Sequence, residues 1–249
     1  MNSALLEVRR LRKAFGALVA TDEVNFDVRE GETHAVIGPN GAGKTTFIKQ
    51  LSGELRPDAG QIRFGGDDIT ALPAPRRSRK GLARSFQITS IYRDFSALEN
   101  VALAVQAQAG HSFRFWRAAR EDRSLVEPSI RILERIGLGD RKHILAANLS
   151  HGEQRQLEIA MALATQPRLL LLDEPVAGMG TDESQRMVEL LAALKGDKTV
   201  VLVEHDMDAV FTLADRISVL VYGRIVATGT PAEIRANPEV RSAYLGEDG

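Results

Sequence analysis

Eight residues in the first quarter of the chain have the types and the spacing needed to bind a nucleoside triphosphate. They read GPNGAGKT over Gly38–Thr45 and fit the pattern G-x-x-x-x-G-K-S/T. Gly41 and Gly43 let the backbone curl so that successive N–H groups point inward and form a nest for anions. A helix beginning near Lys44 adds its positive end, and the lysine ammonium faces the β- and γ-phosphates. The Thr45 hydroxyl is a ligand for Mg²⁺.

The flanking sequence predicts the elements that hold this phosphate loop. Thr33–Ile37 is typical of a short buried strand, and Phe47–Leu51 has a helical pattern. An ordinary glycine-rich strand-to-helix turn is the alternative, and the complete motif between two such elements favours phosphate binding. The expected nucleotide contacts are Gly38, Pro39, Asn40, Gly41, Ala42, Gly43, Lys44, Thr45 and Thr46.

An apolar run that ends in two acids supplies a second set of reactive groups. The sequence LLLLDE at Leu169–Glu174 predicts a buried strand with both acids at its carboxyl end, where ligands bind in open α/β sheets. Asp173 would hold Mg²⁺ through water, and Glu174 would orient and deprotonate the attacking water. A plain strand followed by an acidic loop is the alternative, which the preceding phosphate loop disfavours.

A third motif combines a helix start with groups that suit phosphate. The run LSHGEQ at Leu149–Gln154 precedes a helical pattern over Gln156–Ala164. Ser150, with Glu153 three residues later, predicts a capping box. The same hydroxyl, Gly152 and the helix N-terminus also make a second phosphate-binding surface. One nucleotide does not need two such surfaces on one chain, so two copies facing each other would enclose two ATP molecules.

The composition is that of a soluble globular protein and excludes several classes of function. The 249 residues, 44% hydrophobic and 26% charged, suit one large domain or one domain with a subdomain. The net charge of −1 gives no general attraction to nucleic acid or anionic membrane, and the absence of cysteine excludes disulfides and thiolate chemistry. The N-terminus lacks a secretory apolar core, and no apolar run approaches the roughly 20 residues of a spanning helix. At a membrane, another chain would have to hold this one.

The order of patterns along the chain predicts an α/β fold. Residues 4–28 and 60–64 have the character of antiparallel strands, and helical patterns dominate residues 97–166. Three further strands are expected at Leu169–Leu172, Thr199–Val203 and Ile217–Val221, separated by helices near Glu183–Leu194 and Met207–Ala214. We therefore expect a P-loop NTPase core with a parallel sheet, an N-terminal antiparallel β subdomain and a helical insertion subdomain.

With these motifs in this order, the chain resembles the nucleotide-binding subunit of an ATP-binding cassette (ABC) transporter. The phosphate loop matches Walker A, Leu169–Asp173 matches Walker B, and LSHGE at Leu149–Glu153 matches the family signature, usually LSGGQ. The resemblance covers nearly the whole chain. It implies a single domain over residues 1–249, in which residues 1–87 and 167–249 form the nucleotide-binding core and residues 88–166 form the helical subdomain.

The resemblance also implies roles that the residues alone do not. Gln87 would contact Mg²⁺ and report to the transmembrane partner, His205 would contact the γ-phosphate, and Phe15 would stack on adenine. As lone residues these would have ordinary structural explanations. The implied catalytic set is Glu174, His205, Lys44 and Gln87; the metal ligands are Thr45, Gln87 and Asp173; and Phe15, Ser150, Gly152 and Glu153 join the phosphate loop in binding the nucleotide.

Two positions depart from the family pattern. His151 replaces the first glycine of the usual signature pair, and Gly180 stands where many members carry an aspartate after Walker B. Ser150 and Gly152 are retained, so nucleotide binding is still expected. The departures bear on how the two copies of a dimer are coupled.

The similarity of short sequence runs indicates the branch of the family. The run DEPVAGM and the insertion around Phe113–Trp116 resemble the subunits that serve uptake of branched-chain or hydrophobic amino acids. A related branch serving urea, an exporter ATPase for lipid or lipopolysaccharide, and a soluble ABC ATPase without a transport role are the alternatives.

The implied partners follow from the family. They are transmembrane permease subunits, a second copy of the chain or a homologous ATPase subunit as dimer partner, and indirectly a solute-binding protein, with ATP and Mg²⁺ as cofactors and no nucleic acid. The chain would lie peripherally on the cytoplasmic face of the inner or plasma membrane. The segment after Gln87 is expected to dock the permease, with Ile91, Tyr92 and Phe95 as apolar anchors.

Overall fold

A computed structural model describes residues 4–85, 91–109 and 122–240 of the chain. Its centre is a sheet of strand order β10-β9-β3-β8-β7-β6, in which β10 is an antiparallel edge and the other neighbours are parallel. Buried apolar residues fill its central strands because both faces of the sheet are covered. The strands are β3 (Thr33–Ile37), β6 (Leu82–Arg84), β7 (Leu169–Asp173), β8 (Thr199–Val203), β9 (Arg216–Val221) and β10 (Arg224–Gly229).

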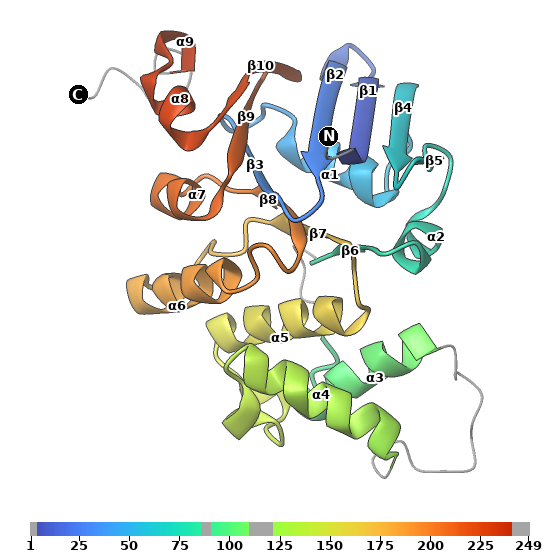
Figure 1. Cartoon of the computed structure of the whole chain (residues 1–249), viewed down its shortest axis with the longest axis vertical. Helices are drawn as coiled ribbons and strands as arrows, with labels where there is room; N and C mark the ends of the chain where they lie inside the picture. The colour runs from blue at the N-terminus through green and yellow to red at the C-terminus, as the bar shows by residue number, and fades with distance from the viewer. Residues whose placement is uncertain (1–3, 86–90, 110–121, 241–249) are drawn as a thin grey trace.

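A second, antiparallel sheet lies beside the first and has the order β2-β1-β4-β5. Its strands are β1 (Ala4–Phe15), β2 (Leu18–Arg29), β4 (Ala59–Phe64) and β5 (Asp67–Asp68). Helix α1 (Lys44–Ser52) buries Phe47, Ile48 and Leu51 in one hydrophobic core that contains residues of both sheets. The helix that follows the phosphate loop is therefore held between two sheets (Figure 1).

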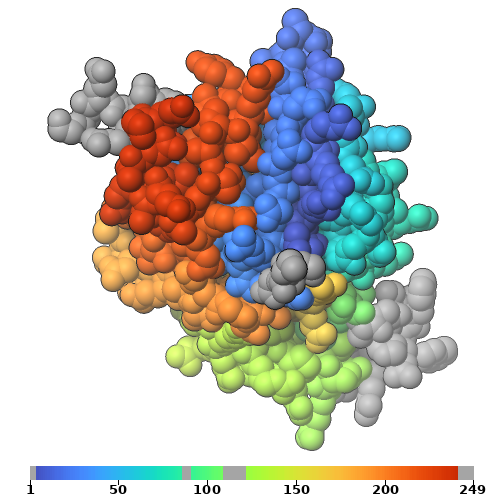
Figure 2. All heavy atoms as spheres, turned by 45° about the horizontal axis from the view of Figure 1, so that its top comes forward, coloured from blue at the N-terminus to red at the C-terminus, as the bar shows by residue number. Residues whose placement is uncertain are grey.

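The other face of the central sheet is covered by helices that share a second core. Helices α3, α4 and α5 gather at one end of the molecule, and α6 and α7 lie nearer the sheet (Figure 1). Figure 2 shows the N-terminal sheet, in blue to cyan, next to the C-terminal elements in orange to red. None of the described helices is long and apolar enough to span a membrane. The helices are α2 (Ala74–Arg79), α3 (Ala97–Ala109), α4 (Arg123–Arg135), α5 (His151–Ala164), α6 (Thr181–Ala192), α7 (Met207–Leu213), α8 (Pro231–Ala236) and α9 (Pro238–Val240).

The predicted α/β fold is confirmed, and several boundaries are corrected. Strands at Thr33–Ile37 and Thr199–Val203 have the predicted bounds. The helix expected at Glu183–Leu194 begins at Thr181, because Gly180 is the extended N-cap and acids in the first turn favour the helix start. Strand β6 and helix α2 were not predicted, since each is short and lacks a clear period.

Arg77, a buried arginine of α2, forms hydrogen bonds to the C-terminal end of α1. The Arg77 guanidinium is 1% exposed and donates to the carbonyl oxygens of Gln50 at 2.7 Å and Leu51 at 2.8 Å. It also donates to the carbonyls of Leu72 and Thr70 at 2.8 and 3.0 Å. Burial lowers the pKa of Arg77 to about 10, so it is still charged at neutral pH. A positive charge at a helix C-terminus is favourable, and here it joins α1 to α2.

Candidate nucleotide-binding site

The phosphate loop joins β3 to α1 through backbone conformations that favour glycine. Gly43 has a φ of 105°, and a Cβ atom there would lie 2.0 Å from the carbonyl oxygen of Ala20. A Cβ on Gly38 would lie 2.0 Å from the carbonyl oxygen of Leu220. Both glycines are therefore required by close backbone contacts from β2 and β9, as well as by the turn.

The start of α1 is built to receive an anion. Its N-cap is Gly43, which has no side chain to accept hydrogen bonds from the N–H groups of the first turn. The N–H groups of a first helical turn have no carbonyl partners within the helix, and the helix dipole gives them a partial positive charge. A phosphate group fits such a cradle without further modification.

Lys44 is held across the same loop. Its side chain is almost buried, and the ammonium donates to the carbonyl oxygens of Gly38 at 2.5 Å and Pro39 at 3.0 Å. Burial lowers the pKa of Lys44, while the nearby Glu174 and Asp173 carboxylates act in the opposite direction. The structure thus brings Lys44 close enough to Asp173 and Glu174, at the carboxyl end of β7, for their charges to interact.

Asp173 ends β7 and is 1% exposed. Its Oδ2 accepts from Arg84 Nη2 at 2.9 Å, whereas its Oδ1 is buried and has no hydrogen-bond partner among the described residues. Burial raises the pKa of Asp173, and the Arg84 charge and hydrogen bond oppose that rise. A buried carboxylate oxygen with no donor suits a cation.

The donor set also fits Mg²⁺ rather than a transition metal. Carboxylate and hydroxyl oxygens, here Asp173 and Thr45, are ligands that Mg²⁺ prefers. No group of three or more His, Cys, Asp or Glu side chains in the described ranges could hold a metal. Mg²⁺ commonly binds through one or two carboxylates together with substrate phosphates, so a sparse protein shell is what such a site requires.

Glu174 and His205 lie together at the carboxyl edge of the sheet. Glu174 has a φ of 49°, an uncommon left-handed conformation for a residue with a side chain, and its N–H donates to the carbonyl of Val203 at 2.8 Å. Its Oε1 is 3.8 Å from Nδ1 of His205, whose side chain is 56% exposed. Of the five non-glycine residues with a positive φ in the described ranges, Glu174 is the one that the sequence assigned to catalysis.

A buried acid that the sequence analysis did not single out fixes these two loops. Glu204 is fully buried, and its carboxylate accepts from the backbone N–H groups of Val176, His205 and Asp206 at 3.1, 2.8 and 3.3 Å. Burial raises the pKa of Glu204, and the three N–H donors oppose the rise. The signal was present, since Glu204 directly follows a buried apolar strand, as Asp173 and Glu174 do.

The signature motif starts α5, five residues earlier than the predicted helix. The predicted capping box is confirmed: Ser150 Oγ accepts from the Glu153 N–H at 3.2 Å, and Glu153 Oε2 accepts from the Ser150 N–H at 2.8 Å. The Ser150 hydroxyl also donates to Glu183 Oε1 at 3.1 Å. Glu153 forms an ion pair with Arg141 at 2.9 Å. The Glu153 carboxylate is thus engaged in its own helix start.

The predicted site residues fall into separate groups. The phosphate loop, Asp173, Glu174 and His205 are brought together, but no hydrogen bond or ion pair in the described structure joins them to Ser150, Gly152 or Glu153. Phe15 lies at the end of β1, half exposed, with the Lys13 ammonium 5.6 Å from its ring centre. Gln87 lies outside the described residues.

The expected docking anchors are only partly available. Tyr92 and Phe95 are 55% and 40% exposed, and their rings stack with centres 5.5 Å apart. Ile91 is 8% exposed and belongs to the main hydrophobic core, so its assignment as a surface anchor was wrong. The sequence pattern could not separate these three residues, since burial is decided by packing against α3 and its neighbours.

A phosphate loop after β3 and paired acids at the carboxyl end of β7 define a P-loop NTPase, and a capped signature helix defines its ATP-binding cassette form. Residues 21–177 match the family model described as ABC transporter. Residues 224–249 match the model described as branched-chain amino acid ATP-binding cassette transporter. The chain belongs to the ABC transporter family, and its activity is ATP hydrolysis.

Full-length relatives agree with the family models. The chain is 40% identical over 254 residues to the high-affinity branched-chain amino acid transport ATP-binding protein BraF of Pseudomonas aeruginosa, covering 99% of this chain and 100% of BraF. It is 39% identical over 259 residues to the corresponding protein LivG of Escherichia coli, with the same coverage. A crystal structure of the ADP conformation of an ABC transporter cassette superimposes with a TM-score of 0.86 at 29% identity, covering 98% of this chain and all of that one. The resemblance predicted from the motifs is confirmed.

Proposed function

We propose that the chain is the ATP-hydrolysing subunit of an importer for branched-chain or other hydrophobic amino acids. The observation that carries this proposal is the match of residues 224–249 to a model of the branched-chain amino acid branch. Sequence identity of about 40% over nearly the whole length of BraF and LivG, both named as branched-chain amino acid transport ATP-binding proteins, supports the same branch. A urea importer, a lipid or lipopolysaccharide exporter and an ATPase without a transport role are the competing functions.

Reconstitution separates these functions. The tagged chain is purified from its native membrane together with its permease subunits and placed in proteoliposomes with the cognate solute-binding protein. We expect ATP-dependent uptake of leucine, isoleucine or valine, and no uptake of urea. Uptake of urea alone, or purification without any membrane subunit, would reject the proposed substrate class or the transport role.

In the proposed mechanism the phosphate loop binds the triphosphate. Backbone N–H groups of the loop and of the first turn of α1 donate to phosphate oxygens, and Lys44 exchanges its carbonyl acceptors for the β- and γ-phosphates. Thr46 extends these contacts into α1. Phe15, half exposed at the end of β1, is available to stack on adenine.

The metal site is assigned to Thr45, Asp173 and Gln87. When bound, Mg²⁺ neutralises charge on the phosphates of the substrate. The Asp173 Oδ1 atom supports this assignment, because it is buried without a hydrogen-bond partner in the described ranges.

Glu174 is assigned as the base that takes a proton from the attacking water. Its carboxylate lies in the same electrostatic neighbourhood as Lys44, and the left-handed backbone at Glu174 turns the chain sharply after β7. His205, 3.8 Å away, is assigned to the γ-phosphate, and Glu204 fixes the backbone that carries it. Both side chains are thereby oriented from the same edge of the sheet.

The signature surface is assigned to a second copy of the chain or to a homologous ATPase subunit. Ser150, Gly152 and Glu153 lie at a helix start at which Ser150 is exposed and Gly152 is buried. Among the described residues, no hydrogen bond or ion pair joins this helix start to the phosphate loop of its own chain. Closure of two copies would therefore place each signature against the partner's nucleotide. A Cβ atom built on Gly178 would lie 3.8 Å from His151 Cε1. Gly180, the other departure from the family pattern, is the N-cap of α6, and Glu183 of that helix accepts from the Ser150 hydroxyl.

The proposed membrane contact completes the assignment. The division into a core of residues 1–87 and 167–249 and a helical subdomain of residues 88–166 would let the helices move with permease subunits. Tyr92 and Phe95 provide an exposed aromatic pair for such a partner. The chain would then be peripheral, on the cytoplasmic face of the membrane.

A further inference from the structure

A line of polar contacts joins the end of the phosphate-loop helix to the acid at the end of β7. Asp173 Oδ2 accepts from Arg84 Nη2 at 2.9 Å. Nη1 of the same guanidinium lies 2.6 Å from Glu54 Oε2 as an ion pair without hydrogen-bond alignment. Glu54 Oε1 accepts from the Ser52 hydroxyl at 2.9 Å, and Ser52 is the last residue of α1. The four side chains form a continuous connection between two nucleotide-site elements.

The middle of this connection is buried, so its charges matter. The side chains of Arg84 and Asp173 are 5% and 1% exposed, and that of Glu54 is 31% exposed. Removing one member of a buried pair leaves the other charge uncompensated, which is strongly unfavourable. Arg84 comes from β6, which pairs in parallel with β7, so the two buried side chains arise from neighbouring strands.

Arg84 makes the two oxygens of Asp173 unequal. Oδ2 is occupied by the guanidinium, while Oδ1 has no hydrogen-bond partner in the part of the chain that the structure describes. A carboxylate fixed through one oxygen presents the other in a defined direction. Mg²⁺ demands near-ideal coordination geometry, and partners behind a metal ligand commonly set its orientation.

We propose that Arg84 is a positioning residue for the metal–nucleotide site, and that Glu54 holds the guanidinium through the terminal nitrogen that does not contact Asp173. The inference rests on the proposed role of Asp173 as a Mg²⁺ ligand. In the described structure no hydrogen bond or ion pair joins Arg84 to the phosphate loop or to Glu174, so it acts through Asp173. The planar fork of arginine can hold two carboxylates at once, which a single ammonium cannot do with the same geometry.

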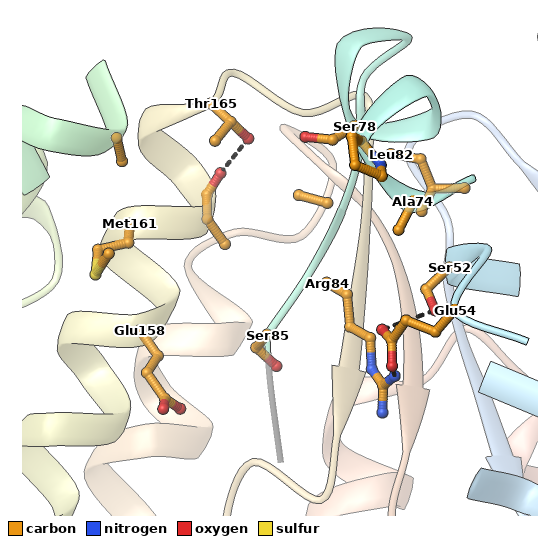
Figure 3. Close-up of a pocket in the computed structure, with 14 residues that line it drawn as sticks. Ser52, Glu54, Ala74, Ser78, Leu82, Arg84, Ser85, Glu158, Met161 and Thr165 are labelled. Carbon is orange, nitrogen blue, oxygen red and sulfur yellow. Dashed lines mark hydrogen bonds and ion pairs between the residues drawn. The ribbon is translucent and has the colours of Figure 1, made fainter. Parts of the chain in front are cut away.

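The same residues line a pocket, so this connection is not sealed inside the core. Arg84, Glu54 and Ser52 border a cavity of about 350 Å³, whose other walls come from α2, α3 and α5 (Figure 3). In Figure 3 the Arg84 and Glu54 side chains meet on the side of the pocket away from Glu158 and Met161. A molecule entering the pocket would meet Arg84 beside its contact with Glu54.

Nucleotide affinity measured with and without Mg²⁺ tests the role of Arg84. The dissociation constant of a non-hydrolysable ATP analogue is compared in excess Mg²⁺ and in EDTA, together with the melting temperature. In Arg84→Gln, the increase in affinity caused by Mg²⁺ is expected to be about tenfold smaller than in the unmodified chain. The affinity in EDTA should be unchanged. Arg84→Lys should recover part of the increase. Arg9→Gln is the control, because Arg9 on β1 is exposed and forms its ion pair with Glu7, and it should match the unmodified chain.

Glu54→Gln tests the contact on the other side of the guanidinium. Its amide can still accept a hydrogen bond but lacks the charge, so we expect a loss about threefold in the same direction. If the two residues act as one unit, the double variant Arg84→Gln/Glu54→Gln should lose no more Mg²⁺-dependent affinity than Arg84→Gln alone. Additive losses would show that Glu54 does not act through Arg84.

Asp173→Asn distinguishes failure of this inference from failure of the proposed function. If Asp173→Asn retains the full gain from Mg²⁺, the assignment of Asp173 as a metal ligand is wrong and the inference falls with it. If Asp173→Asn loses the gain but Arg84→Gln keeps it, only the role of Arg84 is overturned. Equal weakening with and without Mg²⁺ also overturns it, because a purely structural role predicts that result. Should Arg84→Gln fail to fold, an unchanged gain in Glu54→Gln is the overturning result.

Discussion

The two phosphate-binding surfaces of this chain are built in opposite ways. The phosphate loop lies between two sheets, and Lys44 and Asp173 are buried. Glycines of the loop lie in close contact with the backbone of β2 and β9. The signature surface is a helix start with an exposed Ser150, whose polar groups are satisfied by Glu153 and Glu183 of the same chain, and Gly152 beside it is buried. One surface contains buried charged side chains, and the other is a capped helix start with an exposed serine.

The difference indicates where nucleotide affinity and dimer formation should reside. In the buried cradle, the N–H groups of the first turn of α1 face a phosphate without rearrangement, while Lys44 releases the carbonyl oxygens of Gly38 and Pro39. An exposed serine that already has a carboxylate partner must exchange that partner to reach a phosphate, so its net gain is smaller. We therefore expect changes in the loop to affect binding within one chain, and changes in the signature to affect mainly the assembly of two.

The largest effect is expected at the acid next to the loop. Glu174→Gln should bind ATP normally and lose about a thousandfold in turnover, because an amide cannot take the proton of water. Steady-state ATPase assays and calorimetry with Mg·ATP measure the two quantities. The bound variant should accumulate as an ATP-dependent dimer in sedimentation. Hydrolysis at the unmodified rate would remove Glu174 from the mechanism.

Loss of the loop cation comes next. Lys44→Ala should weaken ATP binding about a hundredfold, since several charge-assisted hydrogen bonds to phosphate are lost together. Lys80→Ala is a matched control, because Lys80 pairs with Asp67 on an exposed surface. Calorimetry that finds equal affinity for Mg·ATP in both variants would contradict the assignment of the phosphate loop.

A buried histidine on β3, the strand before the phosphate loop, is expected to make the stability of the fold depend on pH. His34 on β3 is buried, with Nδ1 2.9 Å from the Asp27 carbonyl oxygen and Nε2 2.8 Å from Ser218 Oγ. Burial, and then the Arg216 charge, lowers its pKa from 6.5 to about 3. The unfolded chain therefore binds a proton below pH 6.5 that the folded chain excludes, so stability falls as the pH drops from 6.5 toward 3. The loss at pH 5 should be about 2 kcal/mol.

Urea unfolding at pH 7 and pH 5 measures this loss. His34→Gln should be less stable at pH 7 and should have a flatter pH dependence, because its side chain does not titrate. His143→Gln, at an exposed position, should keep the dependence of the unmodified chain. An unchanged slope in His34→Gln would show that another group is responsible.

A smaller effect on folding is expected at the signature. Ser150→Ala should cost about 1 kcal/mol through loss of the N-cap of α5, with the ATP affinity of the monomer unchanged. ATP-dependent dimerisation should be lost. Ser150→Thr retains a capping hydroxyl and serves as the control for helix stability. Weakened ATP binding by monomeric Ser150→Ala would break the distinction between the two surfaces.

No effect on the nucleotide is expected from the aromatic pair. Tyr92→Asp should leave ATP binding and the melting temperature unchanged, because the Tyr92 side chain is 55% exposed. It should reduce co-purification of the permease subunits in detergent, since a charge opposes apolar docking. Full retention of the complex, with normal solute-stimulated ATPase activity, would exclude this surface from docking.

Local motifs made much of this site predictable. The phosphate loop, the acids after β7 and the Ser150–Glu153 capping box are each encoded within a few residues, so their spacing alone carries the chemistry. The supporting contacts are not local. Arg84 and Asp173 are 89 positions apart, and Glu204 reaches Val176 across 28 positions. No period or spacing in the sequence predicts such pairs, because they depend on which strands become neighbours.

The same reason explains the errors in the fold. Central strands were predicted well because continuous apolar runs are typical of a sheet covered on both faces. The short strand β6 was missed because its three residues, including Arg84, have no strand-like pattern and are buried only by their neighbours. Ile91 was predicted to lie on the surface because nothing in its local sequence indicates that it packs into the main core.

The central claim is that one active site needs the phosphate loop of one copy and the signature of another. Equal amounts of Lys44→Ala and Ser150→Ala chains, each inactive alone, are mixed and assayed for ATPase activity. If the claim holds, each mixed dimer has one intact composite site out of two, so activity should rise above that of either variant, to about a quarter of the unmodified level when the chains pair at random. If each chain used only its own loop and signature, the mixture would be as inactive as its components, and that result would contradict the account.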